Sequence, residues 1–242
     1  MRKFLVFFLV NYMHVEVSAE NCGTCKCLNN AAKCFLSNDK EFPSLPVKIE
    51  DIYIQERDLS RMGTKSNRNL KKLRNLKKLT IVSSSLTFHS LERLSLKTTR
   101  LEEINFSKNR LQKLTALPIT LKKFQVKQNA VNNLQSGLFG GMKNLSSVDV
   151  SENKLDYISE DLFGSRISIR RGSKLDLDLS QNLLTFFPAS IINQLQQLSI
   201  KLILDLSENP INCECSMSWV AKLSPRTTIK GSCNTPMKYL GN

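Results

Sequence analysis

Cysteine is the residue type whose spacing in this chain points most directly to chemistry. Seven cysteines lie near the two ends of the 242-residue sequence, at Cys22, Cys25, Cys27, Cys34, Cys213, Cys215 and Cys233. Cysteines this close together form disulfides in oxidising compartments or bind zinc. A zinc site is disfavoured because the chain has two histidines, His14 and His89, and because its N-terminus is of a secretory type. We expect disulfides, although spacing alone leaves three pairings open for the four N-terminal cysteines.

The first 19 residues have the three parts of a secretory signal peptide. Basic residues at 2–3 precede an apolar run at 4–10, and small residues at 17–19 predict cleavage before Glu20. The apolar run is too short to cross a hydrocarbon layer of about 30 Å, which argues against a membrane anchor. We therefore expect a secreted, extracellular chain, and no later segment is long and apolar enough to span a membrane.

Between the cysteine clusters one line of sequence recurs, Leu-x-x-Leu-x-Leu-x-x-Asn-x-Leu. Clear copies are LEEINFSKNRL from Leu101 and LSSVDVSENKL from Leu145. Seven copies begin at Ile49, Leu76, Leu101, Leu121, Leu145, Lys174 and Lys201, at intervals of 20 to 29 residues. This period is typical of leucine-rich repeats (LRRs), in which each copy supplies one strand to a stack. The alternating apolar residues of each copy predict a strand with one inward face.

The expected fold is an α/β repeat, an LRR solenoid. It has a curved parallel sheet on its concave face, an irregular or short-helical convex side, and disulfide caps. We predict a signal peptide at 1–19, an N-terminal cap at 20–45, about seven repeats at 46–208 and a C-terminal cap at 209–242. The recurring position of Asn in the copies predicts a ladder of asparagine side chains that bond backbone groups of neighbouring turns.

One segment does not fit the repeat. LERLSLKTTRL, from Leu91, matches the strand pattern but begins 15 residues after one copy and 10 before the next. Ten residues leave no return path between strands. Either this segment lies on the convex side, which we favour for the chain as written, or the sequence has lost residues around 87–100.

Positive charge is concentrated in one stretch. The formal net charge is +14, and residues 60–130 hold 17 Lys and Arg against 3 acidic residues. Clustered basic side chains attract polyanions such as heparan sulfate, while the simpler interpretation is a solvated, solubilising face. The candidate polyanion site is formed by Lys71, Lys72, Lys77 and Lys78.

The concave face is the expected place for ligand binding. The pattern directs the residues between the inward apolar positions to this face, and the candidate binding residues are Tyr53, Lys78, Lys123, Lys127, Asp149, Asp178 and Asp205. The three aspartates fall in one column, which could meet a basic partner. The simpler interpretation is that Leu-Asp-Leu-Ser is a common LRR strand sequence.

Two N-glycosylation sequons occur, at Asn105 and Asn144. Asn105 falls on the predicted concave face, where a glycan would block the middle of the surface.

Enzymatic activity and cofactors are not expected, because there is no phosphate-binding loop and no nucleophile motif. Nucleic acid is not an expected partner either, since no aromatic stacking platform accompanies the basic residues.

The terminal cysteines resemble the caps of extracellular LRR proteins. Cys22-x2-Cys25-x-Cys27-x6-Cys34 resembles their N-terminal cap, which implies Cys22–Cys27 and Cys25–Cys34 disulfides. NPINCECSMSW followed by CNTPMKYLG resembles their C-terminal flank, which implies a Cys213–Cys233 disulfide. That flank normally has four cysteines. With three here, Cys215 is expected to be unpaired, and we expect the cap to be truncated.

A narrower resemblance covers residues 49–114. The strands IEDIYIQERDL, LKKLTIVSSSL and LEEINFSKNRL are similar, in this order, to the LRR segment of Trk-type neurotrophin receptors. Proteins of the extracellular LRR class recognise proteins or glycans. We therefore expect a module that binds a protein ligand or cell-surface receptor, in adhesion or signalling. One alternative is an ectodomain fragment of a Toll-type or Trk-type receptor, which would be at the cell surface if a C-terminal anchor is missing from this sequence. The other is a matrix protein that binds glycosaminoglycan through basic residues 61–127.

Overall fold

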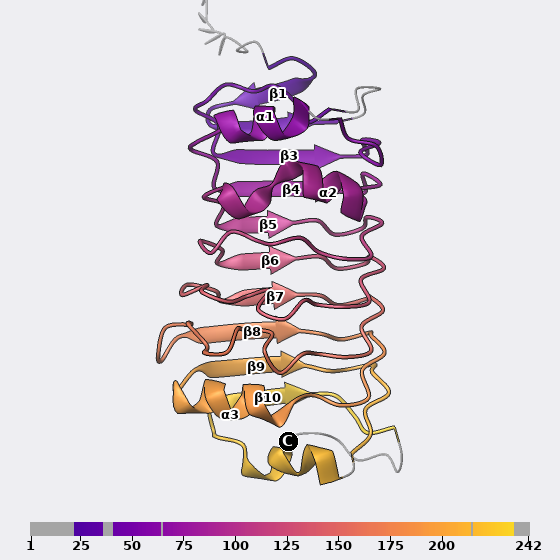
Figure 1. Cartoon of the computed structure of the whole chain (residues 1–242), viewed down its shortest axis with the longest axis vertical. Helices are drawn as coiled ribbons and strands as arrows, with labels where there is room; N and C mark the ends of the chain where they lie inside the picture. The colour runs from indigo at the N-terminus through magenta and orange to yellow at the C-terminus, as the bar shows by residue number, and fades with distance from the viewer. Residues whose placement is uncertain (1–21, 36–40, 64, 214, 235–242) are drawn as a thin grey trace, which may run out of the picture.

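The strands of the chain form one continuous stack. The computed structural model describes residues 22–35, 41–63, 65–213 and 215–234, so the predicted signal peptide lies outside it. In this part of the chain ten strands form one sheet, and Figure 1 shows that they follow one another in chain order. The strands are β1 (Cys25–Leu28), β2 (Ala31–Cys34), β3 (Asp51–Gln55), β4 (Lys78–Val82), β5 (Glu103–Asn105), β6 (Lys123–Gln125), β7 (Ser147–Asp149), β8 (Lys174–Asp178), β9 (Lys201–Asp205) and β10 (Thr227–Lys230).

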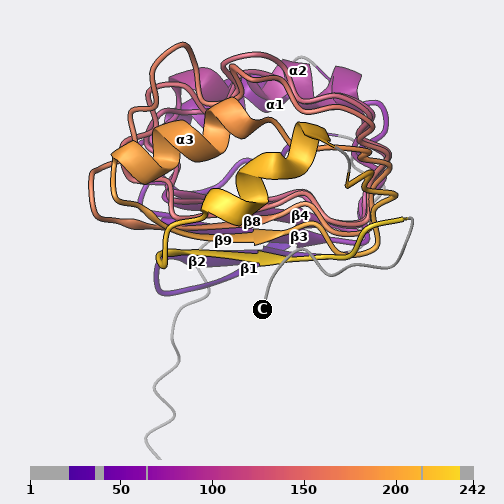
Figure 2. The same ribbon diagram turned by 90° about the horizontal axis from the view of Figure 1, so that it is seen from below.

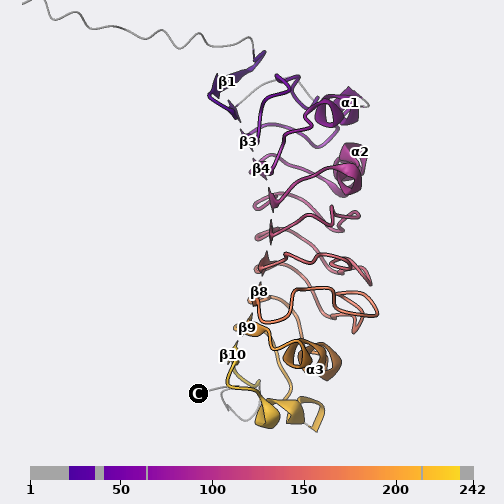
Figure 3. The same cartoon turned by 90° about the vertical axis from the view of Figure 1, so that its left-hand side faces the viewer.

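The sheet forms one layer, and the helices and return segments form the other (Figure 2). The helices are α1 (Lys65–Lys72), α2 (Phe88–Leu94), α3 (Ala189–Gln197) and the 3₁₀ segments η1 (Leu96–Thr98) and η2 (Cys215–Lys222). Figure 3 shows the strands on a gentle arc that is concave on the side away from α1, α2 and α3. This is the predicted LRR solenoid, with a parallel sheet and a convex side that is mostly irregular.

Each of the seven predicted repeats contributes one strand, from β3 to β9. Within a strand the inward side chains are buried and their neighbours are partly exposed, as Ile52 and Ile54 show in β3. The two caps extend the sheet in a way that the repeat pattern did not predict. β2 pairs in parallel with β3, and β10 pairs in parallel with β9.

The asparagine ladder connects successive repeats. Its members are Asn109, Asn129, Asn153, Asn182 and Asn209. Asn153 shows the pattern: its Nδ2 donates to the carbonyl of Val126 in the preceding repeat at 3.0 Å and to that of Val150 in its own repeat at 3.1 Å. Its Oδ1 accepts the backbone N–H of Val131 at 3.0 Å. One side chain thus satisfies buried backbone groups in two repeats, which would otherwise cost about 1–3 kcal/mol each.

The residue before each ladder position has a left-handed backbone. These residues are Glu56, Ser83, Lys108, Gln128, Glu152, Gln181 and Glu208, and their φ angles lie between 49° and 58°. None is glycine, so each position costs about 1 kcal/mol or more relative to a right-handed conformation. The turn recurs because it places the next side chain where it can bond both repeats.

The first two repeats have other residues at the ladder position. Arg57 and Ser84 stand there, and both are buried. The Ser84 hydroxyl accepts the backbone N–H of Arg57 at 3.3 Å and donates to the Val82 carbonyl at 2.8 Å. A shorter side chain therefore performs part of the same bonding at the N-terminal end of the stack.

The disulfides lie at the ends of the stack. They join Cys22 to Cys27, Cys25 to Cys34, and Cys213 to Cys233. The second crosses the β1–β2 hairpin, where its two cysteines are register partners. At the other end Trp219 of η2 is buried and its ring lies 6.3 Å from that of Phe187, which closes the last repeat.

The segment that broke the repeat lies on the convex side. Leu91 and Leu94 are buried residues of α2, and Leu96 begins η1. Thr87 caps α2, since its hydroxyl accepts the Ser90 N–H at 3.3 Å. Further along this side, the Phe139 ring lies 5.7 Å from that of Phe163. These rings form an aromatic contact between neighbouring return segments.

Replacing Asn153 by Ala tests the ladder. We expect the free energy of unfolding to fall by about 2–4 kcal/mol, because the substitution leaves buried backbone donors and acceptors without partners. The measurement is urea unfolding followed by circular dichroism. The control is Asn133→Ala, at an exposed asparagine of the preceding repeat, which should change the free energy of unfolding by about 0.5 kcal/mol or less. Equal losses in the two variants would contradict the role of the ladder.

Candidate functional site

The concave face has two columns of outward side chains fixed by the register of the strands. The first column is Asp51, Lys78, Glu103, Lys123, Ser147, Asp176 and Ile203. The second is Tyr53, Thr80, Asn105, Gln125, Asp149, Asp178 and Asp205. The caps lengthen the second column, because Lys33 pairs with Tyr53 and Lys230 with Asp205. Six of the seven predicted binding residues lie in these columns, and the seventh, Lys127, follows β6.

In the N-terminal half the charges of the first column compensate one another. Glu103 lies 3.0 Å from the Lys123 ammonium and 3.7 Å from that of Lys78. The hydrogen bond from Lys123 is the largest cause of a lowered pKa for the Glu103 carboxyl, which the charges of Lys123 and Lys78 also lower. Although the sequence is strongly basic here, alternation of acid and base across the strands neutralises this part of the sheet.

A second set of ion pairs lies one residue before these strands. Lys77 bonds Glu50 at 2.7 Å, and Lys122 bonds Glu102 at 2.6 Å. These pairs also join neighbouring repeats. Exposed pairs of this kind add little stability, but they leave the lysines involved with compensated charge.

Tyr53 lies in a hollow of the same half of the face. The hollow is lined among others by Lys33, Thr80, Asn105 and Gln125. The Tyr53 hydroxyl donates to the Gln55 side-chain oxygen at 2.6 Å, and its ring lies 6.4 Å from that of the exposed Phe35. The hollow therefore offers amide, hydroxyl and aromatic contacts between the compensated charges.

The aspartates of the second column each close a local turn. Oδ1 of Asp149 accepts the backbone N–H of Ser151 at 3.1 Å, and Asp178 and Asp205 do the same with the serine two residues on, at 3.0 Å. Asn105 makes this bond to Ser107 at 2.9 Å. The aspartate of the common Leu-Asp-Leu-Ser strand sequence thus has a structural role, because its side-chain oxygen closes the turn. The side-chain carbonyl oxygen of an asparagine is sufficient for the same bond, as Asn105 shows. The negative charge is not required by it.

Lys127 lies at the boundary between the two halves. Its ammonium is 2.8 Å from the Glu152 carboxylate. The Glu152 hydrogen bond is the largest cause of a raised pKa for Lys127, and the charges of Asp149 and Asp178 raise it further. Lys127 is therefore oriented toward the acidic half of the face.

The four lysines of the candidate polyanion site do not form one cluster. Lys71 and Lys72 belong to α1 on the convex side, whereas Lys78 begins β4 and Lys77 immediately precedes it. Lys77 is paired with Glu50, and Lys78 with Glu103. The structure separates the convex pair from the two lysines at the sheet.

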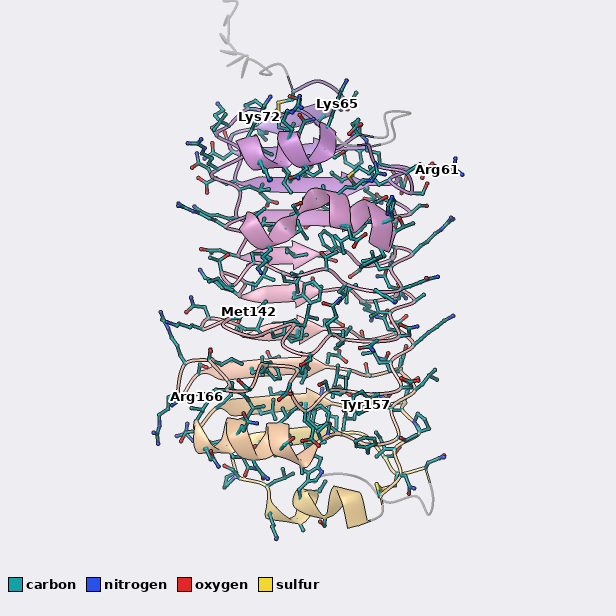
Figure 4. All side chains as sticks on the ribbon, in the orientation of Figure 1. Arg61, Lys65, Lys72, Met142, Tyr157 and Arg166 are labelled. Carbon is teal, nitrogen blue, oxygen red and sulfur yellow. A yellow bond between two sulfur atoms is a disulfide. The ribbon has the colours of Figure 1, made fainter. Side chains whose placement is uncertain are left out.

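A pair of exposed aromatic residues was missed by sequence reasoning. Tyr157 and Phe186 follow β7 and β8, are 47% and 37% exposed, and have ring centroids 6.1 Å apart (Figure 4 labels Tyr157). Leu183, in the same region of the chain, is 54% exposed. Tyr157 and Phe186 each follow a ladder asparagine, Asn153 or Asn182, by four residues. This shared position in the repeat is the sequence signal that could have identified the pair.

The remaining predicted positions are distributed differently. Asn144 is exposed before β7, and Asn105 is half-buried on the concave face. The side chain of Cys215 lies outside the described residues. Within the described part of the chain, no group of three or more His, Cys, Asp or Glu side chains could hold a metal ion. The same part contains no helix of sufficient length and apolarity to cross a bilayer.

The pKa of Glu103 provides a test of charge compensation. We expect it below the ordinary value of 4.5, and we expect Lys123→Met to raise it, since the largest cause of the lowering is removed. A carboxyl whose pKa is lowered on folding contributes stability above its unfolded pKa, and this is lost as pH falls through the folded pKa. Carbon-13 NMR titration of the side-chain carboxyl measures the shift. Lys113→Met, at an exposed lysine off the sheet, is the control, and an unchanged Glu103 pKa in Lys123→Met would contradict the pairing.

The chain is similar to known extracellular proteins. No protein-family model matches it. Keratocan of Gallus gallus is 28% identical over 167 residues, which cover 67% of this chain and 45% of keratocan. Osteomodulin of Bos taurus is 25% identical over 170 residues, covering 67% of this chain and 37% of osteomodulin. The chain thus matches less than half the length of these relatives.

The fold is also found in a solved structure. The crystal structure of human 5T4 (Wnt-activated inhibitory factor 1, trophoblast glycoprotein) has a TM-score of 0.62 and 17% identity, covering 90% of this chain and 82% of that chain. These relatives lend no support to the Trk-type likeness of residues 49–114, which stays a prediction. The stacked strands, the disulfides and the similarity to keratocan and osteomodulin identify the chain as an extracellular leucine-rich repeat protein.

Proposed function

We propose that this chain is a recognition module that binds a protein partner non-covalently through its concave face. The observation that carries the proposal is the column formed by Asp149, Asp178 and Asp205, which we call the acid column. These residues are direct register neighbours, so their side chains recur at the strand spacing of about 4.8 Å. A rigid row of like charges on a sheet favours a partner with basic side chains in complementary positions.

The acid column retains binding capacity beyond its structural role. Each turn uses Oδ1, which leaves Oδ2 of Asp149 and of Asp178 available to a ligand. Among the described residues, Asp149 and Asp178 have no ion pair, and Asp205 lies 3.4 Å from Lys230. Partial burial is the largest single influence on the pKa of Asp205 and raises it, but the hydrogen bonds from Ser207 and the smaller effects of Lys230 together lower it below the ordinary value. A basic ligand would relieve the repulsion among the three neighbouring carboxylates of the column.

Apolar contacts for the same partner could come from Tyr157, Phe186 and Leu183. Exposed aromatic side chains are enriched among the residues that contribute most to protein binding. They follow β7 and β8, the strands that carry Asp149 and Asp178. A secreted binder and the ectodomain of a receptor would both use this surface, so the proposal holds for either setting of the chain.

Neutralising the acid column tests the proposal. The wild-type chain, presented as a multivalent bait, is screened against individually expressed extracellular proteins, and the affinity for each partner is then measured for Asp149→Asn/Asp178→Asn/Asp205→Asn. Asparagine keeps the turn, as Asn105 shows in the same column. We expect affinity to fall by about tenfold or more, with a weaker dependence on salt.

The matched control removes three negative charges elsewhere. Asp156, Glu160 and Asp161 are exposed and lie outside the two columns. Asp156→Asn/Glu160→Gln/Asp161→Asn should bind within about twofold of wild type. Equal losses in the two triple variants would show that net charge alone matters. Unchanged affinity in the acid-column variant would place binding on another surface.

Glycosylation of Asn105 would direct ligands toward the acid column, because a glycan there covers the centre of the N-terminal half. We expect protein from a secretory host to carry a glycan on Asn105, and Ser107→Ala to lose it. The turn survives this substitution, since Asn105 accepts the backbone N–H of residue 107. Peptide mapping before and after enzymatic deglycosylation is the measurement. An unmodified Asn105 peptide from the wild type would refute the expectation.

A further inference from the structure

The positive charge of residues 60–130 is divided between the two sides of the stack. On the sheet side, Lys77, Lys78, Lys122 and Lys123 all lie within 4 Å of a glutamate. Uncompensated charge in this stretch must therefore come from other positions. The strongest concentration is on the convex side around α1.

Five exposed basic side chains define this region, which we call the α1 basic patch: Arg68, Lys71, Lys72, Arg74 and Arg100. Within the described residues, the ion pairs of the chain involve none of them. Figure 4 shows Lys65 and Lys72 at opposite ends of α1, on the side of the stack that carries the helices. The helix α1, which carries Arg68, Lys71 and Lys72, thus lies on the side of the stack opposite the concave face and its acid column.

Two adjoining hollows run through the patch. Arg68 and Lys72 line the first, Arg100 lines the second, and Lys71 and Arg74 line both. Among the residues that the structure describes, none that lines either hollow is acidic. The shared lysine and arginine make the two hollows one basic track that passes from α1 to the return segment of the next repeat.

The helix itself carries unrelieved repulsion. Arg68 lies three residues after Lys65, three before Lys71 and four before Lys72, and α1 contains no acidic residue. Like charges at these spacings destabilise a helix by a few tenths of a kcal/mol each, although Lys71 and Lys72 favourably oppose the dipole at its C-terminal end. A bound polyanion would remove this repulsion.

The helix is held in one orientation from beneath. The buried Ser66 hydroxyl donates to Glu41 at 2.6 Å and accepts the Phe42 N–H at 2.8 Å. The Asn69 amide donates to the Phe42 carbonyl at 2.7 Å. These bonds fix α1 to the segment after the N-terminal cap, so the basic side chains are presented on a rigid base rather than on a mobile loop.

We propose that the α1 basic patch binds a sulfated glycosaminoglycan chain. The track is extended and basic at both ends, which suits a linear polyanion whose charges recur along its length. An anionic membrane is less suitable, because insertion requires a row of exposed apolar side chains. Among the described residues that line the hollows, Val47 is the one large apolar residue that is exposed. The proposal uses the opposite side from the acid column, so either can fail without the other.

Heparin is the probe for the test. The chain is applied to a heparin column and eluted with a sodium chloride gradient, and its affinity is measured in solution at physiological salt. Lys71→Gln/Lys72→Gln/Arg74→Gln removes three charges from the patch. Lys77→Gln/Lys122→Gln/Lys123→Gln is the matched control, since it removes three charges that are already paired. We expect elution of the wild type above about 0.15 M salt and at least a tenfold loss of affinity in the patch variant. In the control variant we expect heparin affinity to fall by about twofold or less.

Three results would overturn the proposal. Equal losses of heparin affinity in the two variants would show that binding depends on net charge and not on this site. An unchanged heparin affinity in the patch variant would exclude the site. Binding of the wild type to phosphatidylserine vesicles but not to heparin would assign the patch to a membrane. Thermal unfolding of both variants, followed by circular dichroism, separates these results from misfolding.

Discussion

The structure depends on the bonding of each ladder asparagine to two repeats at once. A parallel sheet of three- to five-residue strands has few hydrogen bonds of its own, and the turns after the strands would leave buried backbone groups unsatisfied. Asn109, Asn129, Asn153, Asn182 and Asn209 satisfy these groups across the repeat boundary. The ladder therefore fixes the position of each repeat on its neighbour, and it offsets the cost of a left-handed residue before every rung.

Fixed register determines the chemistry of the concave face. Because neighbouring strands are in register, Glu103 forms ion pairs with both Lys78 and Lys123, and the three aspartates of the acid column become adjacent. The first arrangement neutralises a basic stretch, and the second concentrates negative charge. Part of the positive charge that is not paired with acids lies around α1 on the convex side. A chain with a net charge of +14 thus has a concave face that is nearly balanced in one half and acidic in the other.

Much of the fold could be predicted from the sequence, because the repeat and the Asn position depend on local spacing. The seven strands and the convex position of Leu91–Leu94 are examples. Charge placement could not be predicted in this way. The pentapeptide Asn-Leu-Lys-Lys-Leu occurs at 69–73 and at 75–79, yet the first copy ends α1 and the second enters β4. Only the three-dimensional register shows that Lys77 and Lys78 meet glutamates from other repeats. The sheet extensions by β2 and β10 were equally hidden, since neither cap carries the repeat pattern.

The division of charge between the two sides of the stack is the central claim, and NMR with charged paramagnetic probes tests it most directly. The relaxation of backbone amide protons is compared for a cationic and an anionic nitroxide added to the wild-type chain. We predict stronger relaxation by the cationic probe at Asp178 and Asp205, stronger relaxation by the anionic probe at Arg68 and Lys71, and nearly equal effects at Ile104 in β5. Stronger relaxation by the anionic probe along the whole concave face would contradict this division.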